Sequence, residues 1–69
     1  MQDWQQRVVD EKKELDNKIG RLTQFTQTQE FQSLPLPETD RLVRQLNAME
    51  DYSEILGERI AAFEGELRG

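Results

Sequence analysis

The sequence predicts an all-α fold, namely an antiparallel two-helix hairpin that assembles into an oligomeric helical bundle. Apolar residues recur at seven-residue steps in both halves of the 69-residue chain, a pattern typical of helices that pack lengthwise. A stretch containing two prolines separates the halves. We therefore expect a single helical-hairpin domain over residues 1–69, with helices at about 3–27 and about 38–66 and a connection at about 28–37.

The first helix is expected to begin near Asp3, whose carboxylate can cap it and place negative charge at its N-terminus. Gly20 lies inside this helix at a cost of about 1 kcal/mol relative to alanine, and a run of threonines weakens the last turn. We expect the helix to fray at about Phe25 or Gln27. Its apolar positions are Met1, Val8, Leu15 and Leu22, flanked by Trp4, Ile19 and Phe25.

In the connection, Phe31 and Leu34 are expected to fold back onto the end of the hairpin as a hydrophobic plug. Pro37 suits the first turn of the second helix, because a backbone N–H would have no helical partner there. The second helix should end among Gly65 and Gly69. Its two apolar rows are Leu42, Met49, Leu56 and Phe63, and Leu46, Ser53, Ile60 and Leu67.

Matching the apolar rows of the two helices predicts how they pair. Ser53 interrupts an apolar row, and we expect its hydroxyl to bond back to its own helix. In the predicted pairing, Trp4 meets Phe63, Leu15 faces Ser53, Glu11 lies near Arg59, and Lys18 lies within reach of Asp51 or Tyr52.

The composition predicts that one copy is marginally stable by itself. A chain of this length buries a modest fraction of its surface, and only 35% of its residues are hydrophobic. It has no cysteine, so neither a disulfide nor a thiolate metal site can supplement a thin core. Self-association is the simplest source of the missing burial, and we expect a homo-oligomer.

Charge and hydropathy limit the partners. The net charge is −5, and the excess of acid follows residue 27, which argues against a long nucleic acid as partner. No stretch approaches the roughly 20 apolar residues that span a bilayer, and the N-terminus lacks a basic region followed by an apolar run. We expect no membrane association and a cytoplasmic location.

Catalysis has little support in the sequence. The chain has no histidine and no cysteine, so a serine nucleophile would lack its usual base and a metal site would rest on carboxylates alone. The four glycines are dispersed and form no phosphate-binding loop. We predict no catalytic residue, no metal site and no cofactor, and hence no enzyme.

Polar residues also recur at seven-residue steps beside the apolar rows, and two interpretations are open. In the structural one, pairs such as Arg7 with Glu11 add about 0.2–0.5 kcal/mol each to the helix, and others fix the pairing of the helices. In the functional one, copies assemble so that cations face a shared groove and neutralise phosphates, while an aromatic ring stacks on a base. The candidate ligand-binding residues are Trp4, Arg7, Lys18, Arg21, Tyr52 and Arg59.

Over nearly its whole length the chain resembles small helical-hairpin proteins of tailed bacteriophages and prophages. More distantly it is similar to the phage anti-CBASS sponges, which assemble from short hairpins and sequester cyclic oligonucleotide signals between subunits. The resemblance implies an anti-defence protein in the host cytoplasm, with Tyr52 and Lys18 as the tyrosine and lysine that contact the nucleotide. It is carried by Trp4, Arg7, Val8, Glu11, Glu14, Leu15, Lys18, Ile19, Leu22, Phe25, Phe31, Leu34, Leu42, Gln45, Leu46, Met49, Tyr52, Leu56, Arg59 and Ile60.

Two other functions stay open. The chain could be a helical interaction protein that binds a host or phage protein, with its acidic second helix steering the encounter. It could also be a purely structural bundle with no ligand.

Overall fold

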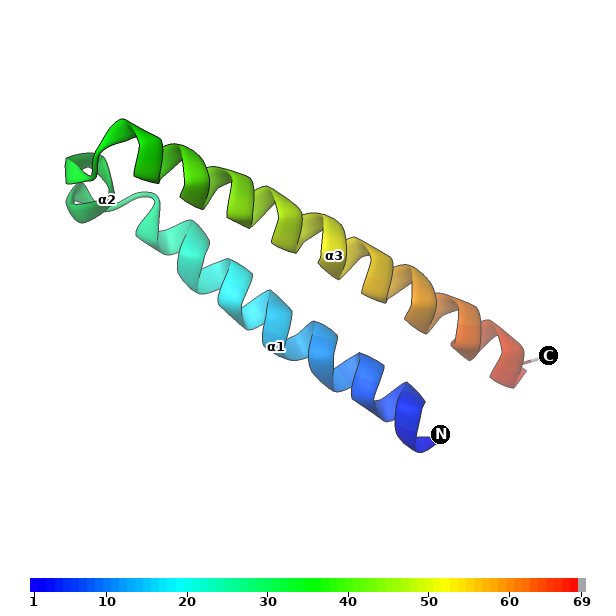
Figure 1. Cartoon of the computed structure of the whole chain (residues 1–69). Helices are drawn as coiled ribbons and strands as arrows, with labels where there is room; N and C mark the ends of the chain where they lie inside the picture. Colours follow the sequence, from blue (N-terminus) through cyan, green and yellow to red (C-terminus); the bar gives the residue numbers. More distant parts are fainter. Residues whose placement is uncertain (69) are drawn as a thin grey trace.

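The computed structural model describes residues 1–68, and the side chains of residues 1–65, as three helices (Figure 1). They are α1 (Asp3–Phe25), α2 (Gln29–Ser33) and α3 (Leu36–Arg68). The two long helices, α1 and α3, pack along each other in opposite directions, and α2 lies in the turn between them (Figure 1). The described residues include no strand, so the prediction of an all-α chain is confirmed.

The start of α1 differs from the expectation at Asp3. The residue before the helix is Gln2, and Asp3 is the first helical residue, so its predicted capping role is wrong. The side chain of Gln5 serves this end instead, because its Oε1 accepts a hydrogen bond from the backbone N–H of Gln2 at 2.8 Å. Gln5 is buried, and Asp3 contributes only its charge to the first turn.

The connection contains a helical turn that the sequence analysis did not predict. Thr28 organises it, since its hydroxyl donates to the Phe25 carbonyl at 2.7 Å and accepts from the Phe31 N–H at 3.2 Å. The rings of Phe25 and Phe31 meet edge to face with centroids 6.0 Å apart. Phe31 therefore folds back onto the end of α1, as predicted.

The helix α3 begins two residues before the predicted start at 38. Pro35 precedes it, and its carbonyl accepts the backbone N–H groups of Glu38 at 2.9 Å and Thr39 at 3.1 Å. Pro37 lies in the first turn, as expected. At the other end the helix runs past Gly65 to Arg68. Of the predicted C-terminal positions, the side chain of Leu67 and the whole of Gly69 lie outside the described part of the chain.

The core between α1 and α3 is thin. Leu56 is fully buried at its centre, and the ring of Trp4 meets the ring of Phe63 edge to face at 5.6 Å, which confirms the predicted Trp4–Phe63 contact. Because few side chains are fully buried, each contributes a large share of the stability. The buried apolar residues are Val8, Leu56 and Phe63, with Val9, Leu15 and Ile60 packed against them.

The two glycines inside the long helices should respond differently to substitution. A Cβ at Gly20 would meet no atom within 4 Å, whereas one at Gly57 would lie 3.3 Å from Cε of Lys12. We expect Gly20→Ala to raise the free energy of unfolding by about 0.5–1 kcal/mol, since alanine loses less backbone entropy in a helix. Gly57→Ala should raise the free energy of unfolding by a smaller amount. Urea denaturation followed by circular dichroism measures both, and an equal gain would contradict the crowding at Gly57.

Candidate functional site

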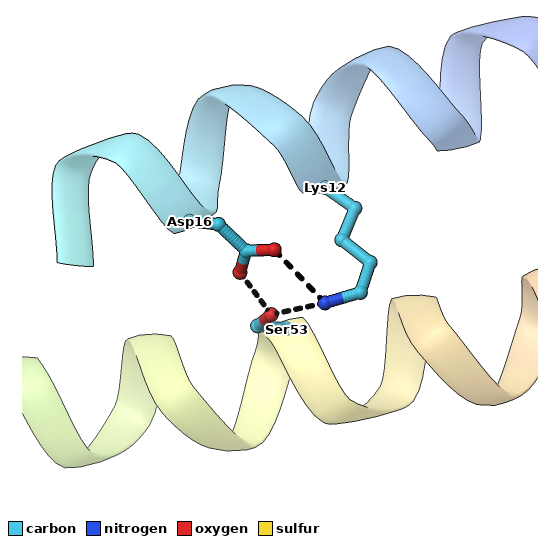
Figure 2. Close-up of polar contacts among 3 residues, drawn as sticks. All are labelled: Lys12, Asp16 and Ser53. Atoms are coloured by element: carbon cyan, nitrogen blue, oxygen red, sulfur yellow. Dashed lines mark hydrogen bonds and ion pairs between the residues drawn. The ribbon is translucent and has the colours of Figure 1, made fainter. Parts of the chain in front are cut away.

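A polar layer of three residues interrupts the apolar contact between α1 and α3. Figure 2 shows Lys12 and Asp16, one turn apart on α1, pointing toward Ser53 on α3. The Lys12 ammonium donates to the Ser53 hydroxyl at 2.8 Å and to the Asp16 carboxylate at 3.0 Å, and the Ser53 hydroxyl donates to Asp16. Ser53 is buried, so the predicted bond back to its own helix is wrong. The prediction placed Leu15 opposite Ser53, but the partners that bind its hydroxyl are the charged residues Lys12 and Asp16.

This layer makes stability depend on pH through Asp16. Hydrogen bonds from the Ser53 hydroxyl and the Lys12 ammonium lower the pKa of the Asp16 carboxyl, while partial burial opposes them. The folded state therefore binds this proton less readily than the unfolded state does. The resulting stabilisation is present at neutral pH and is lost as pH falls below about 4, the ordinary pKa of aspartate.

Asp16→Asn should remove this dependence. We expect its melting temperature to fall less than that of the wild-type protein between neutral and acid pH. The matched control is Asp10→Asn on the same helix, because Asp10 is exposed and bonds only to Gln6 of its own helix among the described side chains. Thermal unfolding at both pH values checks the prediction, and equal losses in all three proteins would argue against it.

A second polar surface, which we call the stripe face, lies on one side of the α1–α3 pair. It consists of two exposed rows with alternating steps of three and four residues, one on each helix. The hydroxyl of Tyr52 donates to the carboxylate of Glu11, which places the two rows side by side. The row on α1 is Trp4, Arg7, Glu11, Glu14, Lys18 and Arg21, and the row on α3 is Gln45, Ala48, Tyr52, Ile55, Arg59 and Ala62.

The stripe face is positive although the chain is acidic. Its two rows carry four cationic side chains and two carboxylates, a net charge of +2 against −5 for the whole chain. Helical spacing puts Glu50 and Glu54 on the far side of α3 from this row. Asp51 and Glu58 lie beside the row, on its edge away from α1. An anion that approaches between the two rows therefore meets attraction.

All six predicted ligand-binding residues lie on the stripe face. Trp4 is 47% exposed and Tyr52 is 43% exposed. Among the described side chains the ion pairs are formed elsewhere, so the cations of this face are available to a ligand. These cations are Arg7, Lys18, Arg21 and Arg59.

Two pairs of predicted neighbours form no bond with each other among the described side chains. The carboxylate of Glu11 is bound by Tyr52 rather than by Arg59, and Lys18 forms no bond with Asp51 or Tyr52.

The candidate residues are spread along the face instead of converging on one point. Arg7 and Lys18 are eleven residues apart on α1, which corresponds to about 16 Å along the helix axis. No pocket is present in the described part of the chain. One copy therefore offers a flat surface with cations and two aromatic rings, and a small ligand bound there would stay largely exposed.

Among the described residues, no three acidic side chains lie together in a way that could hold a metal ion. None of the described helices is both long enough and apolar enough to cross a membrane.

Comparison with known proteins gives one result. Neither the curated proteins nor the solved structures contain a match to this chain. A protein-family model described as Sequestin matches residues 2–62, which include α1, α2, most of α3 and the whole stripe face. Because that match covers well over half of the chain, the protein belongs to the Sequestin family.

Proposed function

We propose that this protein is a phage anti-defence protein that oligomerises and sequesters a small cyclic nucleotide signal without altering it. The family name supports sequestration of a ligand as the general role. The observation that carries the proposal is the stripe face, a surface of net charge +2 with two exposed aromatic rings on a chain of net charge −5. In the host cytoplasm, such a protein would lower the concentration of free signal.

The stripe face has the chemistry that a cyclic nucleotide requires. Guanidinium and ammonium groups form charge-assisted hydrogen bonds with phosphate oxygens. An aromatic ring can stack on any base. Tyr52 is suited to this role because Glu11 holds its hydroxyl, which limits the rotation of the side chain. Trp4 is held by its contact with Phe63 and still exposes almost half of its surface.

Oligomerisation belongs to the same proposal, because a flat surface encloses little of a small ligand. Pockets for small molecules usually bury most of the ligand's surface. A second copy that covers the stripe face would exclude water from the phosphates and strengthen the electrostatic attraction. The thin core also favours assembly, since a second copy buries apolar side chains that one copy leaves exposed.

Calorimetric titration with a panel of cyclic di- and trinucleotides tests the proposal, with linear mononucleotides as matched controls. The mass in solution should be measured on the same sample by sedimentation. We expect saturable binding of one or more cyclic nucleotides, at a simple fraction of one ligand per chain. A folded protein that gives no heat with any member of the panel would refute nucleotide sequestration.

A second candidate is an interaction protein that binds another protein. It is favoured by two exposed apolar side chains one heptad apart on α3 and outside the stripe face, Leu36 at 82% exposed and Val43 at 43%. The acidic side of the same helix would steer a basic partner. A negative result in the titration above would shift the balance to this candidate.

A further inference from the structure

We infer that two copies of the chain pair through α3, antiparallel about a two-fold axis at Ile55, and that this pairing converts the stripe face into a groove. The identity of the ligand in that groove rests on the proposed function. The pairing itself rests on the exposed row of α3 and is tested separately.

The α3 row of the stripe face has the pattern of a helix-packing surface that no helix of its own chain covers. Its members are separated by alternating steps of four and three residues, as in a coiled-coil seam. The seam that packs on α1 is a different one and contains Leu56 and Phe63. At the centre of the uncovered row, Ile55 is 53% exposed. The part of the row on either side of this centre is Ala48, Tyr52, Ile55, Arg59 and Ala62.

The order of side chains in this row is self-complementary. In a two-fold interface, if residue i contacts residue j of the other copy, then residue j contacts residue i. An antiparallel pairing centred on Ile55 brings Ile55 against its own copy and Ala48 against Ala62, and it puts Arg59 within one residue of the level of Tyr52. The large apolar side chain lies on the axis, and small side chains at both ends let the helices approach closely. This match identifies a second copy as the occupant.

Around Tyr52, charge complementarity supports the same pairing. The second copy's Arg59 arrives at the hydroxyl end of Tyr52, which leaves the face of the phenol ring open to the groove. The carboxylate of Glu11 is already bound to the Tyr52 hydroxyl, so the same guanidinium also meets a negative charge. Among the described side chains Arg59 makes no ion pair within its own chain. The two copies therefore supply each other with the missing partner.

This pairing produces a groove from two flat faces. In an antiparallel pair, equivalent sides of the two helices lie together, so both α1 helices stand on the same side of the paired α3 helices. Tyr52 and Arg59 of both copies then form the floor, and the α1 rows form the walls, with Arg7 and Lys18 among them. Every cation of the groove is present twice. A small anion bound there would be contacted by both chains.

Disulfide formation tests the position of the axis, because the chain has no cysteine of its own. A disulfide requires Cα atoms about 4.4–6.8 Å apart, a distance that Ile55 reaches with its own copy only near the axis. We expect Ile55→Cys to form a covalent dimer on mild oxidation. The control is Val43→Cys, an exposed apolar position on the same helix outside the row, and it should stay monomeric on a reducing-agent-free gel.

Two charge substitutions test the pairing in solution by sedimentation. Ile55→Asp places two carboxylates on the axis and should reduce the mass of the assembly, whereas Val43→Asp should not. Glu58 lies beside the row and within one residue of the level of Asp51 of the second copy, so like charges meet there. Glu58→Lys replaces this repulsion with attraction and should lower the dissociation constant about threefold to tenfold. Circular dichroism verifies that each variant keeps its helices.

The outcomes separate this inference from the proposed function. A dimer that depends on Ile55 but binds no cyclic nucleotide would overturn the proposed function and leave the pairing intact. Nucleotide binding by a protein with the mass of one chain would overturn the pairing. So would an assembly whose mass is unchanged by Ile55→Asp, or an Ile55→Cys variant that forms no more disulfide than Val43→Cys.

Discussion

Replacing Leu56 with alanine is expected to lower the free energy of unfolding by about 2–5 kcal/mol. Leu56 has an exposed fraction of 0% and lies at the centre of the core between α1 and α3. Truncating such a side chain costs the lost transfer free energy and leaves a cavity. A small domain is stable by only about 0.05–0.15 kcal/mol per residue, so this single change removes a large part of the total. Urea denaturation at a fixed protein concentration measures it.

Leu36→Ala is the matched control for this experiment. Leu36 is the same residue type on the same helix, but it is 82% exposed. Its truncation should change the free energy of unfolding by no more than about 0.5 kcal/mol. Similar losses for both variants would mean that the packing of Leu56 against α1 does not hold the two helices together.

Replacing Lys18 with alanine is expected to weaken cyclic nucleotide binding about 10- to 100-fold. A hydrogen bond to a charged group contributes about 1.5–3 kcal/mol, which corresponds to this range of affinity. Lys18 lies on the stripe face and makes no ion pair among the described side chains, so its ammonium is free to bind a phosphate. Its removal should leave the helices and the assembly unchanged. Calorimetric titration and sedimentation at one salt concentration measure both.

Lys13→Ala is the control for charge. Lys13 is exposed on the same helix, and its spacing from the row of Lys18 puts it outside the stripe face. Lys13→Ala removes the same unit of positive charge as Lys18→Ala does. A loss of nucleotide affinity caused by net charge alone would therefore be equal in the two variants. We expect Lys13→Ala to bind almost as well as the wild-type protein. If Lys18→Ala instead dissociates the assembly, the polar rows have a structural role.

Heptad spacing made much of the fold predictable. It determines which side of each helix is apolar, and matching the two apolar sides already pairs Trp4 with Phe63. The layer around Ser53 was not predictable in the same way. Lys12 and Asp16 have the spacing of an ordinary surface pair, and only the long aliphatic part of the lysine lets its ammonium reach across to α3. Such a layer is indicated when a serine in an apolar row faces two residues of unlike charge that lie one turn apart on the other helix.

The same periodicity explains why the candidate residues share one face. Steps of three and four residues keep side chains on one side of a helix, so the two rows follow from the sequence once the helices are paired. Individual contacts do not follow from it. Glu11 is bound by Tyr52 and not by Arg59, and this outcome depends on side-chain rotamers that spacing does not specify. Which side chain caps a helix also depends on local side-chain conformation, as Gln5 at the start of α1 illustrates.

The elongated form of the molecule affects how its mass can be determined. The chain extends 51 Å in one direction and 15 and 14 Å in the other two, and its radius of gyration is 15.7 Å. A compact chain of the same length would have a radius of gyration of about 11 Å, and 15.7 Å is typical of a compact protein of roughly 170 residues. A gel-filtration column calibrated with globular standards would thus report a single copy as a dimer or larger. Only methods independent of shape, such as sedimentation equilibrium or light scattering, can count the subunits.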